Sequence, residues 1–409
     1  MRLNTRFLFL NIGHATDHLM MLLFPAVVVV MATEFEGGYS EMLPLATGGF
    51  IAFGVFSLPA GWLADRWSRE GMIGLFFLGI GSAAIATSFA STDWQIALGL
   101  FAIGMFAAIY HPVGIAMVSQ GGGAVGKRLG VNGVWGNMGV AASALTAGAL
   151  ADAFGWRAAF LIPGLLVVGI GIAWLIHCRG DAGQRATAAG AAARKSKVEP
   201  TADWKRVLVI VAVATAFGGF IFNATTIALP KVFDDRLADL AGTATQAGAL
   251  IAIVYALAAF SQIVVGSLID KHPLKWIFVG ITLGDVLIFL LAANATGSSM
   301  LALALVMMVL VFGQIPITDT LVARHTPEDW RGRVYAVKYV LSFGVASTAA
   351  PAIAWLYGGG LAAWPALDGI SGFAGLFLIC CACAAVVSMA ALMLPRPRPA
   401  PVPAMAGED

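Results

Sequence analysis

Residues 61–70, GWLADRWSRE, follow a long apolar run, and a weaker copy, GSLIDKHPLK, follows a second apolar run at residues 266–275. The 205-residue spacing aligns Gly61 with Gly266, Leu63 with Leu268, Asp65 with Asp270 and Arg66 with Lys271. Pro25 and Pro230 also lie 205 residues apart, and Pro112 and Pro316 lie 204 apart. Three landmarks at nearly one spacing predict a chain of two similar halves, the internal repetition typical of transporters.

The composition around these landmarks is that of a membrane protein. Hydrophobic residues make up 59% of the 409 residues and charged residues 11%, with a mean hydropathy of +0.87. Such a chain has too little polar surface to cover a water-soluble globule. The net charge of +2, without basic runs interleaved with aromatics, argues against nucleic acid as a partner.

Twelve apolar stretches are long enough to cross a bilayer as helices, which takes about 20 residues each. They are Phe7–Met31, Pro44–Leu63, Met72–Phe89, Trp94–Val118, Gly130–Phe154, Ala158–His177, Val207–Pro230, Thr245–Ile269, Trp276–Ala293, Met300–Val322, Val334–Tyr357 and Ile370–Leu394. We therefore predict an all-α membrane protein with two pseudo-symmetric six-helix bundles, 1–178 and 205–395. An Ala/Gly/Arg/Lys-rich linker, 179–204, joins them, and a Pro-rich tail, 396–409, is expected to be disordered.

Basic residues give the expected orientation, because loops rich in lysine and arginine stay on the cytoplasmic side. Most of the 24 lysines and arginines fall on one side when both termini and the linker are placed there. We expect a multi-pass protein of a bacterial cytoplasmic (inner) membrane with cytoplasmic termini. We expect it to act as a monomer in contact with lipid.

The first predicted span carries ionisable groups where hydrocarbon is expected. In NIGHATDHLMMLLFP, residues 11–25, Asn11, His14, Asp17 and His18 fall within an arc of about 120° at 100° per residue. A charge inside the membrane is costly, about 2.5–3.5 kcal/mol on insertion scales, and indicates function. The alternative is that the histidines stay neutral, bonded to helix backbones, with Asp17 paired to one of them.

The second half carries mostly neutral polar groups at corresponding places. Span seven offers Asn223 and Thr226, and span ten offers Gln314. Asp319 and Lys338 each lie about five residues from a cytoplasmic helix end, and they could form a buried pair that closes an inner gate. The alternative is that Lys338 reaches the headgroups by itself. Asp285 lies midway along span nine, without a role in this scheme.

GWLADRWSRE resembles the loop signature of the major facilitator superfamily, Gly-x-Leu-Ala-Asp-Arg-x-Gly-Arg-(Lys/Arg), and GWRAAF at residues 155–160 also resembles a segment of that family. The resemblance implies that these charged loops latch the two halves together. The expected gating residues are Asp65, Arg66, Arg69, Asp270, Lys271, Asp319 and Lys338. In the superfamily fold, spans one, four, seven and ten line the central path. This makes His14, Asp17, His18 and His111 neighbours.

A narrower resemblance is to fosmidomycin-resistance-type efflux proteins. It rests on YHPVG at 110–114, on GVNGVWGNMGVA at 130–141, and on a histidine and an aspartate in the first span. The matching residues are His14, Asp17, His111, Pro112, Gly136, Asn137 and Gly139. We place Asn11, Asn137, Asn223, Thr226 and Gln314 around the substrate cavity.

A carboxylate beside histidines can bind and release a proton as water access alternates. We therefore expect a proton-coupled secondary transporter of a small organic, possibly anionic, solute, and the second resemblance favours export. An uptake symporter stays open, as does a divalent transition-metal transporter that uses His14, Asp17, His18 and His111 as ligands. A transporter-like sensor without turnover is a third class. No catalytic motif indicates an enzyme, and we expect no cofactor.

Overall fold

The computed structural model describes residues 5–35, 38–120, 125–180, 204–326, 328–363, 370 and 372–395. These residues form helices and turns without a strand, and twelve helical stretches are long and apolar enough to cross a membrane. This confirms the predicted all-α fold with twelve spans. The predicted tail, 396–409, and residues 181–203 of the predicted linker lie outside the described residues.

Seven of the spans are single helices in the described part of the chain. They are α1 Thr5–Met31, α4 Arg69–Ser88, α7 Val125–Phe154, α8 Trp156–Gly180, α13 Leu274–Ala292, α16 Glu328–Tyr357 and α17 Gly372–Leu392. A short 3-10 helix, η5 Gly360–Ala363, lies between the last two.

The other five spans are each divided. Span two is α2 Gly38–Met42, η1 Leu43–Ala46 and α3 Thr47–Arg66; span four is α5 Asp93–Ala107, η2 Tyr110–Gly114 and α6 Ile115–Ser119. Span seven is α9 Trp204–Val213, η4 Ala214–Gly218 and α10 Gly219–Arg236; span eight is α11 Ala244–Ala259 and α12 Ser261–Lys271; span ten is α14 Gly297–Gly313 and α15 Ile315–His325. Both η2 and η4 are π-helical turns.

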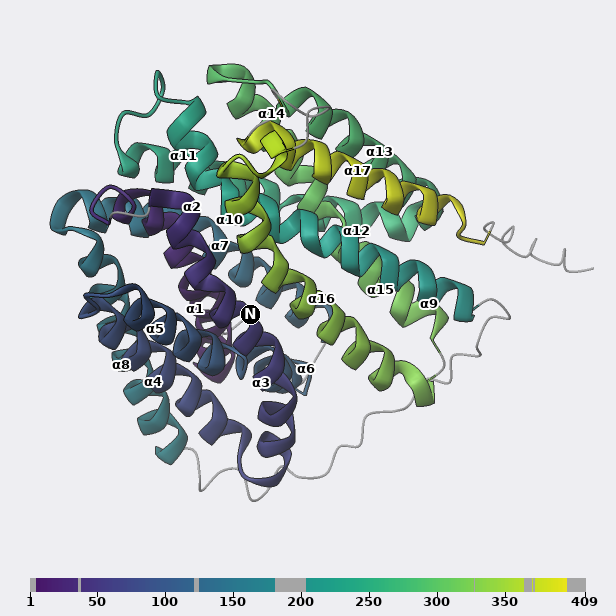
Figure 1. The fold of residues 1–409 in the computed structure, drawn as a ribbon. Helices are drawn as coiled ribbons and strands as arrows, with labels where there is room; N and C mark the ends of the chain where they lie inside the picture. The colour runs from purple at the N-terminus through teal and green to yellow at the C-terminus, as the bar shows by residue number, and fades with distance from the viewer. Residues whose placement is uncertain are drawn as a thin grey trace, which may run out of the picture.

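The helices form two groups in chain order. Figure 1 shows the purple to blue-teal helices α1–α8 at the lower left, and the teal to yellow helices α9–α17 above and to the right of them. We call the end where α8 ends and α9 begins the linker face, and the opposite end the far face. Because successive spans are antiparallel, α1, α7 and α16 begin at the linker face, and α11 begins at the far face.

The two groups touch backbone to backbone near the far face, where α7 meets α11. A Cβ atom on Gly148 would lie 2.3 Å from the carbonyl oxygen of Ala244, and one on Gly248 would lie 2.4 Å from that of Ala144. Small residues permit such close approach of helices in membranes. The Asp152 carboxylate accepts hydrogen bonds from the backbone N–H (2.7 Å) and hydroxyl (2.6 Å) of Thr245. These contacts join the two halves at the far face.

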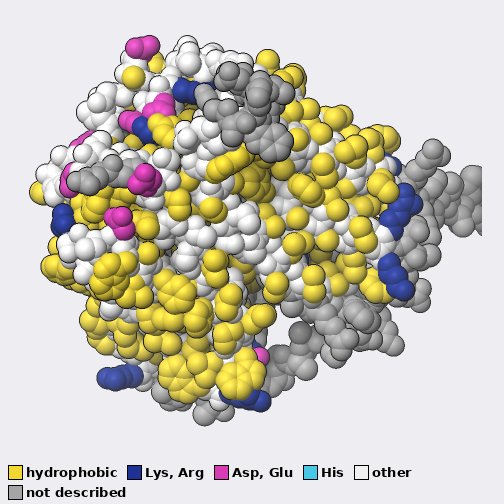
Figure 2. Space-filling view, viewed as in Figure 1, with side chains coloured by type: hydrophobic (Ala, Val, Ile, Leu, Met, Phe, Trp, Pro, Cys, Tyr) yellow, Lys and Arg dark blue, Asp and Glu magenta, His cyan; other side chains and the backbone are white. Residues whose placement is uncertain are grey.

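The surface has the pattern expected of a protein surrounded by lipid. Large apolar side chains such as Leu58, Trp62 and Leu166 are more than half exposed, and Figure 2 shows apolar atoms across the middle of the molecule. Charges collect at the two ends of the helices. Basic residues at the linker face include Arg66, Arg69, Lys271, Lys275 and Arg324, whereas acidic residues at the far face include Glu34, Asp152, Asp234, Asp235 and Asp239.

Candidate functional site

The candidate site begins where α1 packs against α7 through two glycines. A Cβ atom on Gly139 would lie 2.1 Å from the carbonyl oxygen of Ala15, so the two backbones are in contact. One turn earlier, a Cβ atom on Gly136 would lie 2.7 Å from the imidazole ring of His14. The glycines of the GNxG pattern therefore provide the space in which His14 lies.

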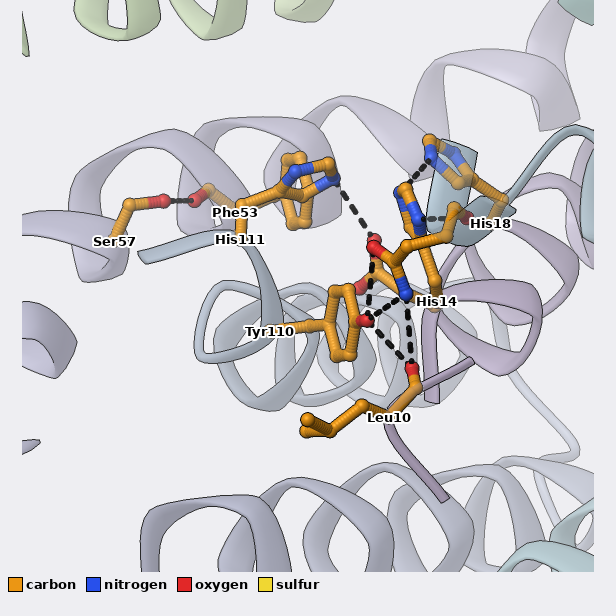
Figure 3. Close-up of polar contacts among 9 residues, drawn as sticks. Leu10, His14, His18, Phe53, Ser57, Tyr110 and His111 are labelled. Carbon is orange, nitrogen blue, oxygen red and sulfur yellow. Dashed lines mark hydrogen bonds and ion pairs between the residues drawn. The ribbon is translucent and has the colours of Figure 1, made fainter. Parts of the chain in front are cut away.

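Span four contributes His111 to the site through its π-helical turn, Tyr110–Gly114. Pro112 lies within this turn, and a proline inside a helix lacks the N–H that would bond one turn back and clashes with that carbonyl group. Wide π turns of this kind occur frequently at functional sites. The turn directs Tyr110 and His111 toward α1, where the Tyr110 hydroxyl donates to the carbonyl oxygen of Leu10 at 2.6 Å (Figure 3).

The hydrogen bonds of His14 define which of its nitrogen atoms carries hydrogen in the neutral form. Its Nδ1 lies 2.7 Å from the backbone carbonyl oxygen of Asn132, which can only accept, so Nδ1–H donates. Its Nε2 is then an acceptor and lies 3.2 Å from Nε2 of His18, which must donate. Figure 3 shows the two rings joined through this contact. His14 thus offers a lone pair and His18 an N–H at this contact, and the two rings can share an added proton.

Asp17, on α1, pairs with the histidine of span four. Its side chain is completely buried, and Oδ2 lies 3.3 Å from Nε2 of His111, whose side chain is 16% exposed. Neither Oδ1 nor Oδ2 has a hydrogen-bond partner among the described residues, so the contact with His111 is one of ion-pair distance. A buried carboxylate is stable only when it is paired or protonated. The Asp17–His111 pair is therefore a place where a proton can reside on either partner.

The histidines line a cavity of about 320 Å³ between the two halves. Its polar lining from the first half consists of His14, His18, His111 and Asn137, and from the second half of Thr215, Asn223, Gln262, Gln314, Thr318, Asp319, Lys338 and Ser342. Asp319 is half exposed and lies six residues before the linker-face end of α15. The cavity thus extends from the histidines in the direction of the linker face.

Two residues predicted for the cavity lie outside its lining. Asn11 is completely buried, and its Oδ1 accepts from Nδ2 of Asn132 at 3.0 Å. Thr226 is also buried, and its hydroxyl donates to the carbonyl oxygen of Phe222 at 2.7 Å in its own helix. Asn11 thus connects α1 to α7, and Thr226 bonds within its own helix, whereas the predicted Asn137, Asn223 and Gln314 do line the cavity.

The predicted gating residues form local contacts at the linker face. Arg69 pairs with Asp65 at 2.6 Å, and the Arg66 guanidinium lies 4.1 Å from the ring centre of Trp62. Across spans eight and ten, Arg324 lies 3.3 Å from Asp270. Lys271 is exposed at the end of α12.

Lys338 and Asp319 form the predicted ion pair, and the Lys338 ammonium also donates to the Thr318 hydroxyl at 3.2 Å. The expectation of a buried pair was wrong in one respect, since the Asp319 side chain is 52% exposed. The carboxylate keeps contact with solvent because it faces the cavity rather than the interior of the bundle.

Asn132 is the main residue that the sequence analysis missed. Its carbonyl oxygen fixes His14, and its Nδ2 also donates to the Tyr110 hydroxyl at 2.9 Å. The sequence carries a signal for it, because an asparagine in an apolar span needs hydrogen-bond partners within the protein. Ser342 and Gln262 were also missed, and each is a polar residue in a predicted span.

The three histidines could also hold a metal ion. One ring nitrogen from each of His14, His18 and His111 can be chosen so that all three lie within 4.8 Å of one another. The bond from His14 Nδ1–H to the Asn132 carbonyl oxygen resembles the outer support that metal-binding histidines usually have. Asp17, the predicted fourth ligand, contacts His111.

Comparison with known proteins first concerns sequence. The family model for the Major Facilitator Superfamily matches residues 12–351 and 239–408 of this chain. The Membrane sensor protein UhpC of Salmonella typhimurium is 28% identical over 148 residues, which cover 35% of this chain and 33% of UhpC. The chain therefore aligns with about one third of that relative.

Comparison of structures extends over nearly the whole chain. A bacterial homologue of the human lysosomal transporter Spinster, crystallised in an inward-facing, unoccupied conformation, has a TM-score of 0.74 at 14% identity and covers 95% of both chains. A D-xylose–proton symporter has a TM-score of 0.71 at 16% identity and covers 94% of this chain and 95% of its own. At such low identity, these structures establish a common fold.

Proposed function

Because the chain belongs to the major facilitator superfamily, whose members are transporters rather than enzymes, we propose that it is a proton-coupled secondary transporter of a small organic solute that works by alternating access. One observation carries this proposal. A completely buried carboxylate, Asp17, contacts a histidine that lines the central cavity. Asp17, His111, His14 and His18 would form the coupling site.

Proton coupling requires a group whose proton affinity changes when the cavity changes sides. The Asp17–His111 contact fits this role, since water in the cavity stabilises the charged pair, and loss of that water favours the neutral pair. The His14–His18 pair at 3.2 Å adds a second place for a proton beside the solute. A protonated histidine there would attract an anionic group of the solute.

The solute class follows from the opposite wall. Asn223, Gln314 and Ser342 offer amide and hydroxyl groups, which bind oxygen and nitrogen atoms of organic molecules. We further propose that the basic linker face is cytoplasmic in a bacterial inner membrane, by the positive-inside rule, and that net flux is export. The resemblance to fosmidomycin-resistance-type efflux proteins supports export as part of this proposal.

The first experiment identifies a solute and then tests coupling. Purified protein is screened by thermal shift against phosphonates, carboxylates, pentoses such as D-xylose, and amino acids such as 5-aminolevulinic acid. The last two are named because structural relatives include a D-xylose–proton symporter and a transporter in complex with 5-aminolevulinic acid. The compound with the largest shift is then used for transport in proteoliposomes.

We expect Asp17→Asn to abolish transport driven by a pH gradient and to retain solute exchange at equal pH. Asparagine keeps the shape of aspartate and can still form hydrogen bonds, but it has no titrating proton. Asp239→Asn, a change at an exposed far-face residue, is the matched control and should behave as the unaltered protein. Undiminished gradient-driven transport by Asp17→Asn would remove Asp17 from the proton path.

The clustering of three histidine nitrogens supports one other candidate, transport of a divalent transition metal. Calorimetry with Zn²⁺, Mn²⁺ and Fe²⁺ separates the two. For an organic solute, His111→Gln should shift the pH dependence of transport more than the apparent affinity. Micromolar metal binding that His111→Gln weakens about 10- to 100-fold or eliminates would favour the metal instead.

A further inference from the structure

A second completely buried acid lies in the other half of the protein, away from the histidines. Asp285 lies in the middle of α13, and its side chain has no exposure. Its Oδ2 accepts a hydrogen bond from Nε2 of Gln314 at 2.5 Å, and its Oδ1 has no hydrogen-bond partner among the described residues. Burial of an unpaired carboxylate costs several kcal/mol, so such a group normally has a reason to be there.

No described cation compensates Asp285. None of the ion pairs within the described residues includes it. From α17, the thiols of Cys380, Cys381 and Cys383 are the titratable groups nearby, and Cys380 interacts electrostatically with Asp285. Helix α14 carries no Asp, Glu, Lys, Arg or His, and the charges of α12, Asp270 and Lys271, lie at its linker-face end. A single amide hydrogen bond is thus the main compensation in this structure.

That amide connects Asp285 to the cavity. Gln314 lies at the break between α14 and α15 and lines the cavity, whereas Asp285 lies behind it. With Nε2 directed at Asp285, the opposite end of the amide, Oε1, lies on the side of Gly218, which also lines the cavity. Gln314 therefore presents a hydrogen-bond acceptor, Oε1, to the cavity.

The charge state of Asp285 determines which end of the amide it prefers. An ionised carboxylate accepts from Nε2–H and leaves Oε1 toward the cavity. A protonated carboxyl group is also a donor, so its O–H can bond Oε1 once the amide has turned, and Nε2–H₂ then faces the cavity. The bound proton is taken from cavity water and returned to it.

We propose that Asp285 is a second proton-binding site of this protein and that its charge state selects whether Gln314 presents an acceptor or a donor to the cavity. The solute contact in the second half is then linked to a proton held outside the histidine cluster. The link to the solute rests on the proposed transport function. Proton binding by Asp285 is independent of that function.

Infrared difference spectroscopy tests the site without a solute. The full chain is reconstituted in lipid with Asp17→Asn as the background, so that the other completely buried carboxyl group of the described residues is absent. Spectra are recorded as the pH is lowered. We expect a carbonyl band of a protonated carboxyl group to appear, and Asp285→Asn to lose it. Asp239→Asn, at an exposed acid, is the control and should keep it.

Gln314→Met is the second variant, and it keeps the test decisive should Asp285→Asn fold poorly. Methionine has a similar length and offers no amide, so the band should remain and move to higher wavenumber as the hydrogen bond is lost. The proposal is overturned by a titration unchanged in Asp285→Asn, by a band unmoved in Gln314→Met, or by a band that does not change with pH. The spectra are recorded without a solute and in a background without Asp17. A negative result would therefore overturn proton binding by Asp285 and leave the proposed transport function to its own test.

Discussion

At the scale of single residues, the site depends on a buried network behind the histidines. Tyr110 and Asn132 contact each other and the first span, and the Asn132 carbonyl oxygen fixes the orientation of His14. The sequence analysis predicted that His14 and His111 are neighbours, because the spans that carry them both line the central path in the superfamily fold. It could not predict the partner of His14, since every residue offers the same backbone carbonyl group.

Tyr110→Phe should lower the free energy of unfolding by about 1–3 kcal/mol, because it removes two buried hydrogen bonds, one to the Leu10 carbonyl oxygen and one from the Asn132 amide. The Tyr110 hydroxyl donates to Leu10 at 2.6 Å and accepts from Asn132 at 2.9 Å. Tyr255→Phe is the matched control, since that buried tyrosine donates one longer bond of 3.3 Å to Thr226. Thermal unfolding of both variants measures the difference, and equal losses would contradict the importance of the network.

At the scale of elements, the extents of the spans follow from apolar length, whereas their interruptions do not. The π turns at Tyr110–Gly114 and Ala214–Gly218 need an account of packing, and only the first contains a proline. Proline also explains the short helix after Gln314, because Pro316 lies in its first turn, where a missing N–H costs nothing. The contact of Asp285 with Gln314 was not predictable for a related reason: Gln314 lies at an interruption in another span.

Gly139→Ala should destabilise the protein, although alanine favours an isolated helix over glycine by about 1 kcal/mol. The added methyl group would lie 2.1 Å from the carbonyl oxygen of Ala15, so α1 and α7 would have to separate. Gly344→Ala in α16 is the control, because no atom lies within 4 Å of its Cβ position, and it should be neutral or stabilising. A melting temperature for Gly139→Ala at or above that of Gly344→Ala would show that the helix contact is unimportant.

At the scale of the whole molecule, the two halves are in backbone contact near the far face, and the histidine cavity extends toward the linker face. The two-half organisation was predictable because repeated landmarks survive in the sequence. The conformational state was not predictable, since the same residues must serve a state open to either side. Which face is cytoplasmic is assigned only from the distribution of basic residues. Labelling from each side of the membrane therefore tests the proposed orientation.

Single cysteines replacing Glu36 and Gly190, in a background without the four native cysteines, should react with a membrane-impermeant maleimide from opposite sides of the membrane. In intact cells Glu36→Cys should be labelled, and Gly190→Cys only after permeabilisation, because basic segments are retained in the cytoplasm. Cysteine at Thr33, an exposed residue just beyond α1, serves as a second external position. Labelling of positions 36 and 190 from one side would refute the proposed topology.

The π turn beside the histidines also bears on the history of the chain. An i→i+5 turn accommodates one residue more than an α-helical turn in the same helix. The repeat spacing is 205 residues at Gly61 and Gly266 but 204 at Pro112 and Pro316, so the first half has one residue more than the second between these landmarks. The π turn Tyr110–Gly114 contains Pro112, whereas Pro316 begins an ordinary α-helix. A one-residue insertion after duplication accounts for both facts and would have rotated His111 toward Asp17 in one copy alone. The asymmetry between a titratable half and a neutral half would then date from that insertion.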